Sequence, residues 1–175
     1  MTRVLLSFLV LAVLVLAVWG MYRGWQRRGR RQSAALGEFP VPPTDPGSVV
    51  LGPATGLYVG SAIAGNWQDR VAVGDIGHRA SAKLTLHADG VLLSRHGASS
   101  IWIPQASIDS ARTDYRLAGK VMTKDGLLVL RWQVGDGMVD TGFRADDKSA
   151  YPDWVRAVSA HAGASTADKK DGDSA

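Results

Sequence analysis

The chain has 175 residues, of which 46% are hydrophobic and 21% charged, which fits one small domain with flanking segments rather than a multi-domain enzyme or a polytopic transporter. It contains no cysteine, which excludes a disulfide framework, a thiolate zinc site, an iron–sulfur cluster and a cysteine nucleophile. Residues 1–37 carry six arginines and no acid, whereas residues 38–175 carry 14 basic and 16 acidic residues, so the net charge of +4 does not indicate a nucleic-acid-binding face.

The run from Val4 to Tyr22 contains 19 residues without a charge and predicts a transmembrane helix over residues 4–22. Trp19, Tyr22 and Trp25 cluster near its C-terminal end, where aromatic rings favour the membrane interface. A cleaved signal peptide is the alternative, but the apolar stretch of such a peptide is about 7–15 residues long and is not followed by a cluster of arginines. An uncleaved anchor is therefore favoured.

Five arginines lie within residues 23–31, after the predicted span, and only Arg3 precedes it. Because positive charge stays on the cytoplasmic side, residues 1–3 should lie outside the plasma (inner) membrane and the C-terminal domain in the cytoplasm. This basic juxtamembrane segment and the interfacial aromatic residues are the predicted contacts with the membrane and its anionic lipid headgroups. They are Trp19, Tyr22, Arg23, Trp25, Arg27, Arg28, Arg30 and Arg31.

Residues 32–55 hold five of the seven prolines and predict an extended, semi-rigid linker. The single P-x-x-P match, Pro40 to Pro43, leaves an SH3-type ligand as an alternative, although a plain spacer accounts for the composition.

Residues 56–162 are expected to form the folded domain, because runs of alternating apolar and polar residues recur between Gly and Asp-Gly turns. The predicted strands are 56–63, 69–76, 81–88, 91–96, 100–105, 108–116, 127–134 and 138–144. A helix follows, with Tyr151, Trp154, Val155 and Val158 on one stripe. Residues 163–175 lack apolar periodicity and predict a disordered tail. The predicted fold is mainly β, a barrel or sandwich of about seven or eight antiparallel strands with a C-terminal capping helix.

This order of strands followed by one helix bearing a tryptophan resembles the pleckstrin-homology (PH) superfold. The stretches GLYVGSAIAGNWQDRV, GHRASAKL, DGVLLSRHG, GLLVLRWQVGD and DTGFR, with the helix around Trp154, resemble a family of actinobacterial single-pass membrane proteins with a PH-like domain. Members are sometimes described as transporters or export proteins. The resemblance covers about residues 1–160 and includes no catalytic signature. Lipid-binding PH domains usually carry several cations on the first two strands, where this chain has only Arg70, which argues against specific phosphoinositide binding.

No nucleophile, P-loop or dinucleotide motif occurs, so no catalytic residue and no cofactor is predicted. His87 and His96 lie on opposite arms of one predicted hairpin, but two histidines do not complete a metal site, and solvent-exposed strand histidines are the favoured interpretation. Trp67, Arg70 and Arg144 are candidate partner contacts. For Trp67, a place at the core edge is the favoured alternative.

The favoured hypothesis is a non-enzymatic, membrane-anchored interaction or scaffold module with a protein partner on the cytoplasmic face. The alternatives are an accessory component of a membrane transport system and a small-ligand receptor or enzyme with a site in the barrel loops. One span without a polar residue beyond Ser7 could transport only together with other chains.

Overall fold

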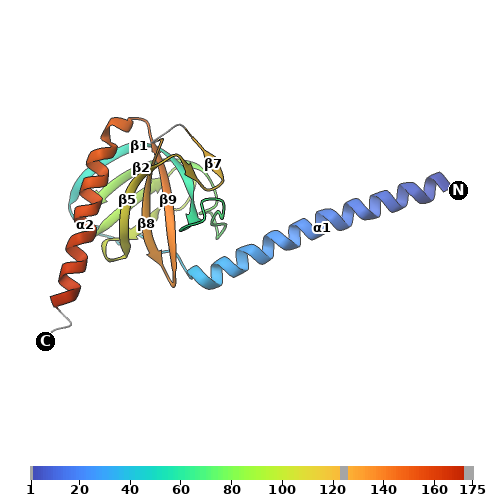
Figure 1. Ribbon diagram of the computed structural model, residues 1–175, viewed down its shortest axis with the longest axis horizontal. Coiled ribbons are helices and arrows are strands. Elements are labelled where there is room, and N and C mark those ends of the chain that lie inside the picture. The colour runs from blue at the N-terminus through green and yellow to red at the C-terminus, as the bar shows by residue number, and fades with distance from the viewer. Residues whose placement is uncertain (1, 123–125, 172–175) are drawn as a thin grey trace.

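The computed structural model describes the backbone of residues 2–122 and 126–171, and the side chains there except residues 2–5, 8, 25–35 and 163–171. In this part of the chain, a long helix, α1 (Thr2–Leu36), leads into a curled β-sheet, and a second helix, α2 (Tyr151–Asp171), packs across it (Figure 1). The strands of the sheet are β1 (Val49–Ile63), β2 (Ala80–His87), β3 (Gly90–Arg95), β4 (Ile101–Pro104), β5 (Ile108–Asp114), β8 (Leu127–Val134) and β9 (Gly137–Ala145).

These seven strands form one antiparallel sheet in the order β4-β3-β2-β1-β9-β8-β5. The strands β4 and β5 lie at the two ends of this order, yet only the 3-10 helix η1 (Gln105–Ser107) separates them along the chain. The sheet must therefore curl until its ends approach each other. Helix α2 contacts both β5 and η1, so it covers the place where the curl stays open. The predicted mainly β fold with a C-terminal helix is confirmed.

The core follows the alternation seen in the sequence. Ala82, Leu84 and Leu86 of β2 point inward and are buried, while Lys83 between them is exposed. On α2, Tyr151, Trp154 and Val158 of the predicted stripe are buried and Val155 is partly buried. Ala162, one turn after Val158, is buried too. Burial of such side chains is the main favourable contribution to folding, at roughly 25 cal/mol for each Å² of apolar surface removed from water.

A chain of hydrogen bonds runs through this core. The Trp132 indole Nε1–H donates to Thr141 Oγ1 (2.8 Å), Thr141 lies 2.9 Å from Ser61 Oγ, Ser61 lies 2.9 Å from the Tyr58 hydroxyl, and Tyr58 donates to the Ile76 carbonyl (2.8 Å). The indole can only donate and the carbonyl can only accept. Each hydroxyl in between therefore accepts one hydrogen bond and donates its own to the next group toward Ile76. Burial raises the pKa of Tyr58 to about 12, so the phenol keeps the proton that it donates.

Residues 69–76 do not form the predicted strand; they belong to a loop that joins β1 to β2. The ladder pairing of this loop with the sheet is a single isolated bridge between Ala62 and Arg70, among the residues that the structure describes. That prediction was wrong because Val71 and Ile76, which give the segment its apolar character, are buried as anchors of the loop. Gly74 has φ +54°, a left-handed backbone conformation that interrupts an extended strand.

The sequence predicted an extended, semi-rigid linker over residues 32–55, and the structure adds that parts of this segment pack against the domain. Leu36 is 1% exposed, and the ring of Phe39 meets Trp132 edge-on with 5.8 Å between the ring centroids. Strand β1 begins at Val49 and pairs with β2 well before residue 56. Pro53 is accommodated there because the register shifts between Leu51 and Ala54, a bulge in which a missing N–H is tolerated.

Helix α2 is longer than predicted. Its backbone continues to Asp171, past Gly163, where the sequence predicted a disordered tail. The alanines and lysines of this stretch have high helix propensity, which a search for apolar periodicity does not register. At the other end, the 3-10 helix η2 (Lys148–Ala150) precedes α2, and the Asp147 carboxylate caps it by accepting the Ser149 N–H (2.9 Å).

The segment between β5 and β8 folds back over the outer face of the sheet. A short hairpin of β6 (Arg116–Leu117) and β7 (Lys120–Val121) places Leu117 and Ala118 in a second apolar cluster with Val59, Leu127 and Val129. The sequence Lys124-Asp125-Gly126 predicts one of the Asp-Gly turns, and its first two residues lie outside the described residues.

Candidate functional site

An open groove of about 860 Å³ lies on the outer face of the sheet, where β9 ends and leads into η2. Its lining comes from β1, β2, β3, the end of β9 and the segment that follows. The lining residues are Thr55, Gly56, Leu57, Ser81, Ala82, Lys83, Ser94, Arg95, His96, Arg144, Ala145, Asp146 and Lys148.

The strand register arranges the outward side chains of the groove in two parallel rows across the four segments. Residues paired across antiparallel strands point to the same face. The first row is His96, Ser81, Leu57 and Arg144, and the second is Ser94, Lys83, Thr55 and Asp146. Backbone hydrogen bonds extend the pairing at both ends, from the His96 N–H to the Ser81 carbonyl (2.8 Å) and from the Asp146 N–H to the Thr55 carbonyl (3.0 Å). The groove thus has a fixed geometry set by the sheet.

Three exposed cations, Lys83, Arg144 and Lys148, converge on this groove, against the single carboxylate of Asp146. None of the three forms an ion pair with any side chain that the structure describes.

Elsewhere on the domain, Arg112 and Arg131 share the carboxylate of Asp140, at 2.8 Å each. Burial by itself would raise the pKa of Asp140, but hydrogen bonds and charge from Arg131 and Arg112 outweigh it and lower that pKa.

A buried arginine lies beneath the groove. The side chain of Arg95 is 0% exposed and forms an ion pair with Asp75 at 2.6 Å, and its guanidinium also donates to the Asp75 and Ser99 carbonyls. Its guanidinium carbon lies 5.0 Å from the centre of the Tyr58 ring, within cation–π range. Every donor group of Arg95 therefore serves the fold, and this residue fixes the floor of the groove rather than offering charge to a ligand.

Of the three candidate partner contacts from the sequence, only Arg144 lies in the groove, and it is exposed. The Arg70 guanidinium donates instead to the carbonyls of Gly77, Val59 and Ala118, which ties the β1–β2 loop to β1 and the β6–β7 hairpin. The structure thus gives Arg70 a structural role.

Trp67 lies in the β1–β2 loop and is partly buried, which agrees with the core-edge alternative. The Arg116 guanidinium carbon lies 5.7 Å from the centre of its ring, and its carbonyl accepts the Gly119 N–H at 2.9 Å. Trp67 therefore helps hold the β6–β7 hairpin and lies outside the groove.

The two histidines of the predicted hairpin lie far apart, because the register places His87 beside the turn and His96 beyond the other end of β3. The prediction that both are exposed was wrong for His87, which is 9% exposed with its Nδ1 atom 3.0 Å from the Gly47 carbonyl. The structure groups no three metal-binding side chains among the residues that it describes.

The residues predicted to contact the membrane are on α1. The described large apolar side chains from Leu6 to Tyr22 are each at least 56% exposed, Trp19 and Tyr22 included, and the Arg23 guanidinium lies 5.2 Å from the Trp19 ring. The side chains of Trp25, Arg27, Arg28, Arg30 and Arg31 lie outside the described set. Over the described residues, no helix combines the length and the hydropathy needed to cross a bilayer.

Sequence reasoning missed Lys83, Lys148 and the hydroxyl groups of Ser81 and Ser94. The alternation of β2 marks Ser81 and Lys83 as outward-facing, so their exposure was predictable. Their meeting with Arg144 depends on the pairing of β1 with both β2 and β9, which no local pattern reveals.

Comparison with known proteins agrees with this architecture. Residues 36–159 match the model of a family described as Bacterial PH domain-like, which is more than half of the chain. No curated protein matches the chain. The matched segment begins at Leu36, the residue that docks the end of α1 onto the sheet, whereas the sequence placed the start of the domain at residue 56.

Proposed function

Because the chain belongs to the bacterial PH domain-like family, we propose that it is a non-enzymatic interaction module held at the cytoplasmic face of the plasma membrane. The observation that carries this proposal is the combination of a filled barrel and an open outer groove. The interior is packed with large side chains such as Trp132, Tyr58 and Phe143, so a binding surface has to lie outside it. Enzyme sites more often enclose their substrate and exclude water.

Anchoring by α1 is supported by the apolar run from Val4 to Tyr22 and by the exposure of its described side chains. Exposed apolar surface of this extent is unfavourable in water, and lipid would cover it. The five arginines after the run favour a cytoplasmic position for the barrel and attraction to anionic headgroups, at about 1 kcal/mol for each arginine near the surface.

Membrane association is tested by washing cell membranes with alkaline carbonate. We expect the full chain to stay in the pellet and a variant with Leu11→Arg and Leu14→Arg to leave it, because each arginine costs roughly 3 kcal/mol at the centre of a span. The matched control is Val41→Arg, which changes an exposed side chain outside α1. Recovery of the unmodified chain in the soluble fraction would contradict the anchor.

The interaction role is tested by chemical crosslinking in native membranes followed by purification of the intact chain. A chain that lacks residues 56–162 but keeps α1 is the control for proteins that simply share the membrane. The proposal predicts a partner that requires the barrel. The same background proteins with both chains, or turnover of a metabolite by the purified protein, would overturn it.

A further inference from the structure

We propose that the outer groove is a docking site for an acidic segment of a protein partner, whose carboxylates contact Lys83, Arg144 and Lys148. An apolar side chain of that segment packs on Leu57. This inference rests on the proposed interaction function and specifies the surface and the chemistry by which the barrel acts.

The groove has an excess of positive charge. Lys83, Arg144 and Lys148 lack an ionic partner among the described residues, while Arg95 beneath them is fully occupied by Asp75 and backbone carbonyls. With Asp146 as the single acid in the lining, three cations face one carboxylate. Surfaces of complementary charge attract and orient one another, so this surface selects a negatively charged partner.

The width of the groove fits a short extended peptide. Its two rows cross four neighbouring segments, which at a strand spacing of about 4.8 Å is a width of about 14 Å. An extended peptide advances about 3.4 Å for each residue, so about four residues fit across the groove. Leu57 lies near the middle of the first row and is partly buried, which leaves an apolar contact between the polar positions. A peptide uses this whole surface, whereas a small anion contacts only part of it.

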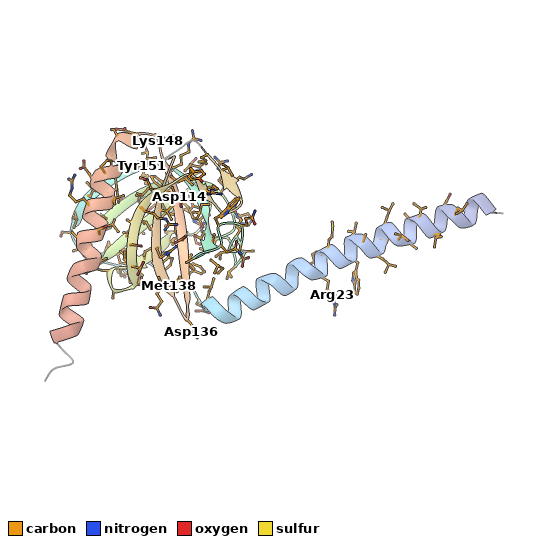
Figure 2. All side chains as sticks on the ribbon, viewed as in Figure 1. Arg23, Asp114, Asp136, Met138, Lys148 and Tyr151 are labelled. Carbon is orange, nitrogen blue, oxygen red and sulfur yellow. The ribbon has the colours of Figure 1, made fainter. Side chains whose placement is uncertain are left out.

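One end of the groove lies away from the point where α1 meets the domain. Lys148 lies at the end of the barrel opposite Asp136 and Met138, the end at which α1 meets the domain (Figure 2). Leu36, at the end of α1, packs beside Gly137 in that same turn. The Lys148 end of the groove is thus remote from the point where the anchor enters, which favours a cytoplasmic protein over the headgroups of the anchoring membrane.

The test measures binding of a fluorescent peptide to the full chain in detergent by fluorescence anisotropy. The peptide has eight residues that alternate glutamate and leucine, and its control replaces each glutamate with glutamine. The groove variant carries Lys83→Glu and Arg144→Glu. The matched variant carries Lys120→Glu and Arg156→Glu, the same change in charge at exposed positions outside the lining.

We expect the groove variant to bind the glutamate peptide about tenfold more weakly than the unmodified chain, and the matched variant within about twofold. The glutamine peptide should bind at least about tenfold more weakly than the glutamate peptide. Equal loss in both double variants would overturn the site, because it would reveal general charge attraction. Displacement of the peptide by equimolar inorganic phosphate would overturn the peptide assignment in favour of a small phosphate ligand.

The crosslinking experiment separates failure of this inference from failure of the proposed function. A partner that requires the barrel but is captured equally by the groove variant would overturn the docking site and leave the interaction role intact. Loss of the partner from the groove variant alone supports both. Capture of no barrel-dependent partner by the unmodified chain contradicts the function itself.

Discussion

Two arginines, Arg70 and Arg95, hold the loop between β1 and β2 in place without regular secondary structure. Arg70 binds the Gly77 carbonyl through two of its nitrogens, and Arg95 binds the Asp75 carboxylate and carbonyl. Planar guanidinium groups offer several donors in fixed directions, so one side chain can satisfy several backbone acceptors. The loop is therefore fixed by its own Arg70 and by Arg95 of β3, which explains how a segment with strand-like composition stays out of the sheet.

The ion pair of Asp75 with Arg95 predicts a dependence of stability on pH. Burial alone raises the pKa of Asp75, but hydrogen bonds from Ser99 and Arg95 and the arginine charge outweigh it and lower the pKa to about 2. Since the folded pKa is below the unfolded value, the ionised carboxylate stabilises the fold above about pH 4, and this contribution is lost as the pH falls toward 2.

Asp75→Asn should lower the free energy of unfolding at pH 7 by about 2 kcal/mol, because the buried guanidinium loses its charged partner. Urea unfolding of the detergent-solubilised chain at pH 7 and pH 3 measures the effect, and the gap between variant and unmodified chain should narrow at pH 3. Asp136→Asn, at an exposed turn, is the control. A gap that is equal at both pH values would contradict the role of the carboxylate.

The buried chain of hydroxyl groups predicts how substitutions of Thr141 change the stability of the domain. Thr141→Val keeps the shape of the side chain but leaves the Trp132 indole without an acceptor and Ser61 without a donor, which should cost about 2 kcal/mol of stability. Thr141→Ser retains the hydroxyl and loses one methyl group, at about 1 kcal/mol. Denaturant unfolding measures the stability of both variants. A Thr141→Ser variant less stable than Thr141→Val would refute the role of the Thr141 hydroxyl.

At the scale of elements, sequence alternation predicted most of the strands because one face of each is buried in the curled sheet. The predicted 127–134 is β8 itself, and 138–144 differs from β9 by one residue at each end. The start of β1 was missed because its first residues include Gly52 and Pro53, which lower strand propensity, while pairing with β2 compensates for them. Long-range pairing is not visible in local composition.

The junction between α1 and the barrel predicts an effect of Leu36. Its side chain is 1% exposed and packs against Gly137, where an added Cβ would lie 2.7 Å from Leu36 Cδ2. Leu36→Ala should destabilise the barrel by about 2–3 kcal/mol and expose the segment after α1 to protease. Limited proteolysis and thermal unfolding measure this, with Val41→Ala, which is 83% exposed in the unmodified chain, as the control. Equal behaviour of the two variants would show that α1 is joined to the domain only by a flexible linker.

At the scale of the molecule, α1 enters at one end of the barrel and the Lys148 end of the groove lies at the other (Figure 2). Local features of the sequence predicted the fold class and offered Arg144 as one of three candidate contacts. They did not predict that Lys83 joins Arg144 and Lys148, because β2 lies far along the chain from the end of β9 and η2, which supply the other two cations. The groove belongs to the tertiary fold, and its charge emerges only when β1 pairs with β2 and β9.

Site-specific photo-crosslinking in native membranes tests the central claim most directly. A photoreactive amino acid is placed at Ser94, in the groove, or at Lys120, on the β6–β7 hairpin outside it. The account predicts a discrete protein adduct from position 94 that is absent from position 120 and disappears when Lys83→Glu and Arg144→Glu are added. Identical adducts from both positions, or lipid adducts alone from the groove, would contradict it.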